Sequence, residues 1–300
     1  MSLVLTLIAD PSRRKLSAAA VEAARTALTA GGAEVGPTDW LSPEEACDLP
    51  FEGLNPMDGE RLVREALGEL PLDLAAQPQA GRRKALLLAD MESTIIGEEM
   101  LDELAEVVGL RAEIAEVTAR AMAGELDFEE ALRARVGKLA GLPLTELEKA
   151  AERMTLNRGA RQTIGTLAAA GIPCTLVSGG FTIFADLVAE ACGFSAVYAN
   201  HLEIEKGAVA GRVQEPILGR EAKRRTLERL SADLGVTPTA ACAVGDGAND
   251  LGMLNAAGLG VAYRGKPAVR ASARYTLDVA DLTGLLFYQG YRREDFADAG

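Results

Sequence analysis

Histidine is almost absent from the sequence, which contains His201 alone among 300 residues. A catalytic triad or metal site built on histidine would depend on this one residue, so carboxylate chemistry is favoured. Cysteine is also sparse, and no pair among the four cysteines has the spacing of a metal-binding motif. Cys174 and Cys242 lie inside apolar runs, which predicts buried structural thiols in a reducing compartment.

Basic and aromatic residues are scarce as well. The chain has 31 lysines and arginines against 44 acidic residues, and its formal net charge is −13 at pH 7. A nucleic-acid partner needs a basic surface, so nucleic-acid binding is not expected. A phosphorylated substrate remains compatible with this charge, because a bound divalent cation can supply local positive charge. The low aromatic content of 4%, with many alanines and leucines, indicates much helix.

The sequence has no long hydrophobic run. The apolar stretch 3–8 ends before Asp10 and is too short for the core of a signal peptide, and no membrane-spanning segment is expected. These features predict a cytoplasmic protein without a membrane partner. The hydrophobic content of 48% and the charged content of 25% are those of a globular protein, and the length allows two or three modules.

The spacing of apolar residues divides the chain into three regions. Residues 1–80 begin with a strand at 4–8 and an alanine-rich helix at 18–30, and they form an N-terminal module. A linker-like stretch at 77–83 precedes a buried strand at 85–89. Residues 98–158 then show the spacing of consecutive helices, which are expected at 99–108, 112–123, 128–139 and 144–154.

Strands and helices alternate from residue 160 onward. Strands are expected at 174–177, 240–244 and 258–262, helices at 163–170, 183–192, 220–234 and 251–257, and a hairpin at 202–213. Alternation predicts a parallel sheet with helices on both faces, and such sheets bind ligands at the carboxyl ends of their strands. Residues 81–97 and 159–300 would form this α/β core, and the helical block 98–158 would be a cap inserted after the first core strand.

Acidic residues follow the strand at 85–89. Asp90 comes directly after it and Glu92 two residues later. In phosphoryl transfer, a first carboxylate at such a position can attack phosphorus and hold a metal, and a second can move a proton. An ordinary acidic turn is the alternative interpretation of this pattern.

Three further polar clusters follow later strands or begin the next helix. Ser178 and the two glycines after it offer a hydroxyl and backbone amides to a phosphate. Lys223 lies near the start of a helix, and Asp246 and Asp250 on a glycine-bent turn offer hard oxygen ligands for Mg²⁺. Taken singly, these clusters could be a strand-to-helix turn, a solvated basic face and an acidic helix cap.

Together, these clusters occur in the order of the motifs of a known family. In this respect the sequence resembles the phosphoserine phosphatases of the haloacid dehalogenase (HAD) superfamily, from about Lys84 to Leu286. The four motifs read here as Asp90-Met91-Glu92-Ser93-Thr94, Ser178-Gly179-Gly180, Lys223 and Gly245-Asp246-Gly247-Ala248-Asn249-Asp250. The resemblance implies a Rossmann-like core with a helical cap, and Mg²⁺-dependent hydrolysis of O-phospho-L-serine to L-serine, the last step of serine biosynthesis.

The resemblance also implies roles for the motif residues. Asp90 would become an aspartyl phosphate, and Glu92 would act as general acid and base. Mg²⁺ would be held by Asp90, the Glu92 carbonyl and Asp246, with Asp250 in support. The charge on the transferring phosphate would be stabilised by Ser178, Gly179, Gly180 and Lys223. Asn249 would orient the site.

Two cap segments resemble the family's substrate-binding helices. Glu99 would meet the substrate ammonium and Arg135 its carboxylate, while Met122 and Phe128 would form apolar walls. A planar guanidinium can grip a carboxylate with two hydrogen bonds, which suits this assignment. Without the family match, Glu99 and Arg135 would be interpreted as ordinary charges on helix surfaces.

One position departs from the family pattern, which has Asp where this chain has Glu92. Related phosphoserine–homoserine phosphotransferases resemble the chain there, although they have Gly where this chain has Ser93. A phosphotransferase and a non-catalytic, amino-acid-sensing protein therefore stay open as alternatives. The N-terminal module loosely resembles a degenerate regulatory (ACT-like) region, and it could bind an amino acid, form a homodimer or only pack against the core.

Overall fold

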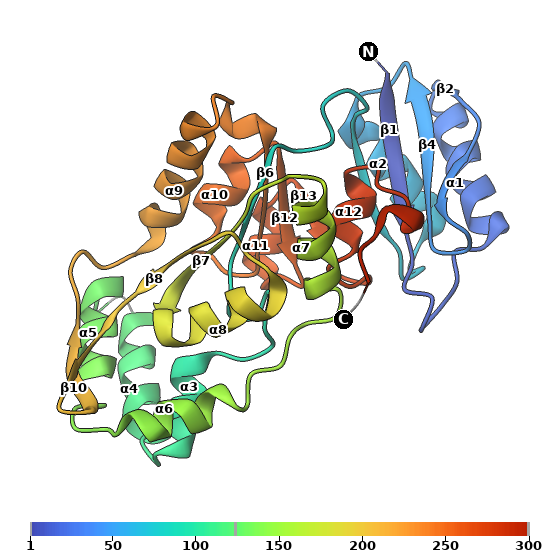
Figure 1. Cartoon of the computed structure of the whole chain (residues 1–300). Coiled ribbons are helices and arrows are strands. Elements are labelled where there is room, and N and C mark those ends of the chain that lie inside the picture. Colours follow the sequence, from blue (N-terminus) through green and yellow to red (C-terminus); the bar gives the residue numbers. More distant parts are fainter. Residues whose placement is uncertain (1, 123–124, 299–300) are drawn as a thin grey trace.

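The computed structural model describes residues 2–122 and 125–298, and the chain runs through three regions (Figure 1). An antiparallel module at the amino terminus leads into a parallel α/β core, and a helical block interrupts the core after its first strand. None of the helices in these ranges is long and apolar enough to cross a membrane. The four cysteines are buried and free, as expected for Cys174 and Cys242.

The N-terminal module is an antiparallel sheet in the order β2-β4-β1-β5, with β3 paired to β4. Its elements are β1 (Leu3–Ile8), α1 (Ala18–Ala30), β2 (Glu34–Val35), β3 (Asp39–Ser42), β4 (Ala46–Glu52), α2 (Pro56–Leu67) and β5 (Asp73–Pro78). Ser17 and Asn55 cap the two helices by accepting backbone N–H bonds. Leu5 and Leu7 pack with the helices, whereas Ile8 belongs to the cluster of the α/β core. The sheet is therefore buried on both faces.

The module is joined to the core through buried polar groups. The Asp73 carboxylate accepts hydrogen bonds from the backbone N–H groups of Asp278, Val279 and Ala280, at 2.7–3.2 Å. The Gln77 side-chain amide donates to the Tyr288 carbonyl at 2.6 Å. Because these bonds bridge residues about 200 positions apart, they fix the module against the end of the core sheet.

The described part of the core contains a six-stranded parallel sheet in the order β13-β12-β11-β6-β7-β8. Its strands are β6 (Leu86–Ala89), β7 (Cys174–Phe181), β8 (Ala196–Asn200), β11 (Ala241–Gly245), β12 (Leu259–Tyr263) and β13 (Tyr275–Leu277). The flanking helices are α7 (Ala160–Ala169), α8 (Thr182–Cys192), α9 (Arg220–Asp233), α10 (Leu251–Ala256), α11 (Pro267–Ser272) and α12 (Gly284–Tyr288).

Side chains of β6 alternate between two apolar clusters. Leu86 and Leu88 pack with residues of α9, α10 and α11, and Leu87 and Ala89 pack with residues of α7, α8 and α12. This alternation is the strand period of two, and it explains why all four residues of β6 are buried. The prediction of a parallel sheet covered on both faces is confirmed.

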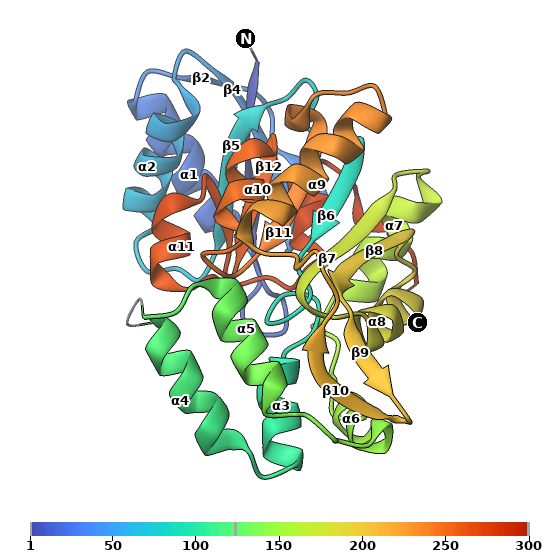
Figure 2. The same ribbon diagram turned by 90° about the vertical axis from the view of Figure 1, so that its left-hand side faces the viewer.

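The helical block lies across the carboxyl end of the core sheet (Figure 2). It consists of α3 (Met100–Val107), α4 (Arg111–Met122), α5 (Phe128–Gly137) and α6 (Leu144–Ala151). An antiparallel hairpin, β9 (Leu202–Glu205) and β10 (Ala208–Val213), projects from the core toward it. The Gly141 N–H donates to the Val209 carbonyl at 2.8 Å, so the hairpin supports the cap. The predicted cap, inserted directly after the first core strand, is confirmed.

Some elements differ from the sequence-based expectation. Strand β7 continues to Phe181 instead of ending at 177, because Phe181 pairs with Asn200 of β8 after a register shift. Ser178 and its two glycines therefore belong to a strand, and α8 begins at Thr182. The division of the chain at residues 80–81, 97–98 and 158–159 into independent units stays a prediction.

Candidate active site

Asp90 lies at the carboxyl end of β6, between β11 and β7 in the sheet. Its side chain is buried, and its Oδ1 accepts the Met91 backbone N–H at 2.8 Å. The strand thus holds one carboxylate oxygen in place at the point where the ends of three parallel strands meet. Burial raises the pKa of Asp90, and the positive charge of Lys223 opposes this effect.

Lys223 joins two carboxylates beneath the site. It lies in the first turn of α9, and its Nζ is 2.6 Å from Asp90 Oδ1 and 2.6 Å from Asp250 Oδ1. All three side chains are buried. Burial lowers the pKa of Lys223, but the adjacent carboxylates raise it more, so the lysine carries its charge. A fixed positive charge therefore faces the Asp90 carboxylate.

The loop after β11 brings two more carboxylates to this point. Asp250 Oδ2 accepts the backbone N–H groups of Asp246 and Gly247, at 3.1 and 2.9 Å. Gly245 is required here, because an added Cβ would lie 2.4 Å from the Asp250 carboxyl carbon. Oxygens of Asp90, Asp246 and Asp250 lie within 4.8 Å of one another. Three hard oxygen donors at this spacing fit a divalent cation such as Mg²⁺.

Polar groups of β7 line the opposite side. The Gly180 N–H donates to the buried Ser178 hydroxyl at 2.9 Å, and Asn200 Nδ2 donates to the Gly179 carbonyl at 2.8 Å. A Cβ at Gly180 would come within 3.1 Å of both Glu92 carboxyl oxygens. The absence of a side chain at Gly180 therefore leaves room for the longer Glu92 carboxyl.

Glu92 links the core to the cap. Its Oε1 accepts the Met100 backbone N–H at 2.9 Å, at the start of α3. Burial and the nearby Glu99 charge raise the pKa of Glu92 to about 7. A carboxyl with this pKa is partly protonated near neutral pH, which suits a group that donates and accepts a proton in one cycle.

Two cap helices carry the charges predicted to bind an amino acid. Glu99 is exposed at the N-terminus of α3 and accepts the Ser93 hydroxyl at 2.9 Å. Arg135 is half-buried on α5, and its Nε donates to the Ala131 carbonyl at 3.3 Å. Burial lowers the pKa of Arg135, and the negative charges of Asp102, Glu92 and Glu99 partly oppose this effect.

Core and cap enclose a cavity of about 440 Å³. Most of the predicted site residues line it, namely Asp90, Glu92, Glu99, Phe128, Arg135, Gly179, Gly180, Asp246 and Asn249. Ser178, Lys223 and Asp250 lie buried beneath its floor. The Phe128 ring lies against Gly179 at the edge of the cavity, because a Cβ at Gly179 would come within 3.3 Å of it, and the side chain remains partly exposed. Met122 ends α4, and its side chain lies outside what the structure describes.

The cavity lining includes charged residues that sequence reasoning missed. Lys266 follows β12, and its Nζ lies 3.6 Å from Asp246 Oδ2. The rule that ligands bind at the carboxyl ends of parallel strands could have identified it. Asp102 also lines the cavity, three residues after Glu99 on the same face of α3. By contrast, His201 lies outside this lining, with its Nδ1 3.1 Å from the Thr182 hydroxyl.

Comparisons with known proteins agree with this geometry. The family model for haloacid dehalogenase-like hydrolases matches residues 87–255. A phosphoserine phosphatase of Streptomyces coelicolor is 38% identical over 97% of this chain and 71% of its own length. A phosphoserine phosphatase of Streptococcus thermophilus is 42% identical over 66% of this chain and 93% of its own. The crystal structure of a probable phosphoserine phosphatase from Vibrio cholerae superposes with a TM-score of 0.79 at 32% identity, covering 98% of this chain and 88% of that one.

Proposed function

Because the chain belongs to the haloacid dehalogenase-like hydrolase family, we propose that it hydrolyses O-phospho-L-serine to L-serine and phosphate. One observation carries the choice of substrate. The cavity above Asp90 presents a cation, Arg135, and an anion, Glu99, from two cap helices. An amino-acid zwitterion needs one partner of each sign, and the phosphate of phosphoserine would then face the Asp90 carboxylate, the nucleophile. The enzyme would act in the last step of serine biosynthesis.

The reaction would proceed in two displacements at phosphorus. In the first, an Asp90 oxygen attacks the phosphorus in line, the bond to the serine oxygen breaks, and Glu92 gives its proton to that oxygen. In the second, water attacks the phosphorus of the aspartyl phosphate and Glu92 takes a proton from the water. The bond to Asp90 then breaks, which regenerates the Asp90 carboxylate and frees phosphate. Glu92 returns to its starting protonation state, so the cycle is balanced.

The remaining site residues would stabilise the charge on the transferring group. Mg²⁺, held by Asp90, the Glu92 carbonyl and Asp246, with Asp250 in support, would neutralise part of the phosphate charge. The Ser178 hydroxyl and the Gly179 amide would donate to phosphate oxygens, and Lys223 would contribute its buried positive charge. Asn249 would orient the phosphate end of the substrate.

Glu92 favours a second candidate, transfer of the phosphoryl group to an alcohol such as homoserine. A longer carboxyl in the acid–base position alters the space available to the attacking hydroxyl, whether that hydroxyl belongs to water or to an acceptor. The two activities share Asp90 and its aspartyl phosphate, and they differ only in the acceptor of the second displacement.

The test is phosphate release from phosphoserine, phosphothreonine and phosphohomoserine, with and without Mg²⁺, and with homoserine added. The proposal predicts that phosphoserine is preferred, that activity needs the metal, and that homoserine leaves free phosphate as the main product. Formation of phosphohomoserine from phosphoserine and homoserine would establish the transferase. Binding of phosphoserine without turnover would support the sensing protein.

A further inference from the structure

The cap returns to the core through a short linker, residues 155–159, that follows α6. Asn157 bonds this linker to the first cap linker, which is the segment between β6 and α3 that carries Glu92. Its backbone N–H donates to the Ile95 carbonyl at 2.8 Å, and its side-chain amide donates to the carbonyls of Thr94 and Ile96 at 2.8 and 3.1 Å. A shift of the second linker must therefore move the loop on which Glu92 lies.

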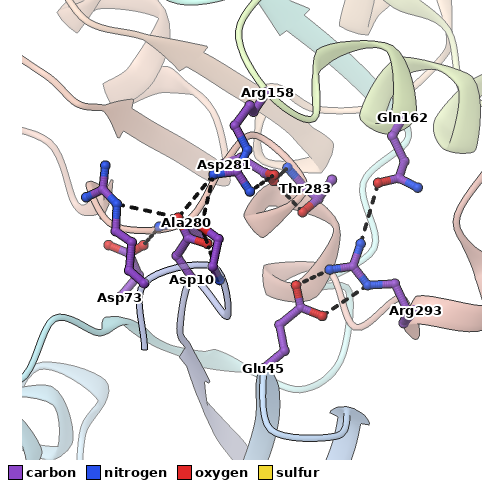
Figure 3. Close-up of polar contacts among 11 residues, drawn as sticks. Asp10, Glu45, Asp73, Arg158, Gln162, Ala280, Asp281, Thr283 and Arg293 are labelled. Carbon is purple, nitrogen blue, oxygen red and sulfur yellow. Dashed lines mark hydrogen bonds and ion pairs between the residues drawn. The ribbon is translucent and has the colours of Figure 1, made fainter. Parts of the chain in front are cut away.

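Arg158, the next residue, reaches out of the linker to the N-terminal module (Figure 3). Its Nη1 lies 3.2 Å from Asp10 Oδ2 and 3.4 Å from the Ser12 hydroxyl, both in the module. Its Nη2 lies 3.7 Å from Asp281 Oδ2 in the core. One guanidinium thus connects cap linker, module and core.

Both carboxylates that face Arg158 are already held in place by other donors. Asp10 Oδ1 accepts the Ser12 N–H and hydroxyl, at 3.0 and 2.6 Å. Asp281 Oδ1 likewise accepts the N–H and hydroxyl of Thr283, at 2.9 and 2.6 Å. In each case the second oxygen, Oδ2, faces the Arg158 guanidinium, and Asp10 Oδ2 also lies 3.6 Å from Arg13 Nε of the module. Asp10 itself is almost fully buried two residues after the end of β1, so it is a fixed anchor.

The linker also has little freedom on its core side. Gly159 has a φ of +80°, and a Cβ there would lie 2.7 Å from Asp281 Oδ1. The Leu282 N–H donates to the Arg158 carbonyl at 3.1 Å. A cavity of about 310 Å³ lies beside the linker, and its lining includes Arg158 together with Asp10 and Ser12 of the module. The ion pair with Asp10 is therefore a direct contact between the module and the linker.

We propose that Arg158 is a positioning residue that couples the N-terminal module to the cap linker. By holding the linker, it favours the arrangement in which the Glu92 carboxyl meets α3 and Phe128 covers the cavity. This inference rests on the proposed function for its kinetic test. It predicts an effect on substrate binding, because an enzyme whose closed arrangement is less populated binds substrate with a lower apparent affinity.

The kinetic test compares Arg158→Ala, Arg158→Lys and Asp10→Asn with Glu45→Gln. Glu45 is the matched control, since it lines the same cavity and bonds Arg293 of the core, but has no bond to the linker (Figure 3). Loss of Arg158 should raise KM for phosphoserine about two- to fivefold, the size measured for partly exposed ion pairs, with a smaller change in kcat. Arg158→Lys keeps the positive charge and should raise KM less than Arg158→Ala does.

The double variant decides whether the two residues act together. Asp10→Asn added to Arg158→Ala should change KM no further, because the contact is already lost. Independent, additive effects would overturn the proposal, as would an equal rise in KM for Glu45→Gln.

Hydrogen–deuterium exchange separates this proposal from the proposed function. Arg158→Ala should speed exchange of the Gly97 and Asn157 amides, whose hydrogen bonds join the two linkers, whereas Glu45→Gln should leave them unchanged. If the wild-type protein does not hydrolyse phosphoserine, the proposed function fails and the exchange experiment still tests the coupling. Unchanged exchange in Arg158→Ala would overturn the coupling whatever the activity.

Discussion

The acid–base role rests on Glu92, a residue one methylene longer than the family's aspartate. Gly180 gives its carboxyl room, and Met100 fixes one oxygen from the cap. Because the pKa of Glu92 is raised to about 7, its carboxyl is protonated below that pH and charged above it. The first displacement needs the protonated form. kcat/KM, which reports the free enzyme, should therefore fall as pH rises above about 7.

Substitution of Glu92 tests this role directly. Glu92→Gln cannot donate a carboxyl proton and should lose at least about a hundredfold in kcat, together with the pH dependence above neutrality. Glu92→Asp should stay active, because it keeps the carboxyl. Steady-state phosphate release between pH 5 and pH 9 measures both. A glutamine variant as fast as the wild type would mean that the proton takes another route.

Arg135 should select substrates by their carboxylate. Arg135→Ala removes a charge-assisted hydrogen bond and should raise KM for phosphoserine about tenfold to a hundredfold. O-phosphoethanolamine keeps the ammonium and the phosphate but lacks the carboxylate, so its KM should change little. Arg133→Ala is the matched control, since Arg133 lies on the same helix but pairs with Glu129 and Glu215 on the surface. Equal losses on both substrates would make Arg135 structural.

At the scale of elements, α5 carries both Phe128 and Arg135 into the cavity. Asp127 caps this helix with a reciprocal capping box, in which Glu130 bonds back to the Asp127 backbone. Asp127→Ala should weaken the start of the helix by about 1 kcal/mol. We expect KM for phosphoserine to rise, because the binding residues are held less firmly.

Ser17→Ala provides the control, since it removes an equivalent cap from α1 in the N-terminal module. It should lower thermal stability by a similar amount and leave KM unchanged. If both variants change KM alike, the effect comes from overall stability and not from α5.

Apolar spacing predicted the cap helices and four of the six core strands, because strongly periodic segments carry their own signal, whereas β8 and β13 were not predicted. The continuation of β7 through Ser178 was not predictable, since glycines normally mark a turn and only pairing with Asn200 keeps this segment extended. The short strand β2 was missed for a similar reason: it is defined by its partner β4, not by its own pattern.

At the scale of the whole molecule, Asp73 fixes the module to the core. Its buried carboxylate accepts four hydrogen bonds from three consecutive backbone N–H groups, at 278–280. Asp73→Ala should lower the free energy of unfolding by at least about 2 kcal/mol, because it leaves buried donors without an acceptor.

Asp39→Ala tests the same interface at its exposed rim, where Asp39 pairs with Arg292. Asp39→Ala should lower the free energy of unfolding by less than about 1 kcal/mol, as for other exposed ion pairs. Urea unfolding measures both variants. Equal losses would contradict the assignment of Asp73 as the main polar anchor.

The docking of the module was beyond sequence reasoning. Asp73 and its partners at 278–280 lie more than 200 positions apart, and no local pattern relates them. The Arg158–Asp10 contact likewise spans 148 positions. Three of the catalytic motifs could be identified because they lie at the carboxyl ends of strands, where topology alone brings them together, whereas Lys223 lies in the first turn of α9.

The most direct test of the account is phosphate release from O-phospho-L-serine by the wild-type protein and Asp90→Asn, in the presence of Mg²⁺. The amide is not a competent nucleophile, so we expect the variant to fall below about a hundredth of the wild-type rate, a barrier increase of roughly 2.7 kcal/mol. Asp186→Asn, an exposed change on α8, should match the wild type. A wild-type protein that releases no phosphate, or an Asp90→Asn variant that keeps more than that hundredth while folded, would contradict the account.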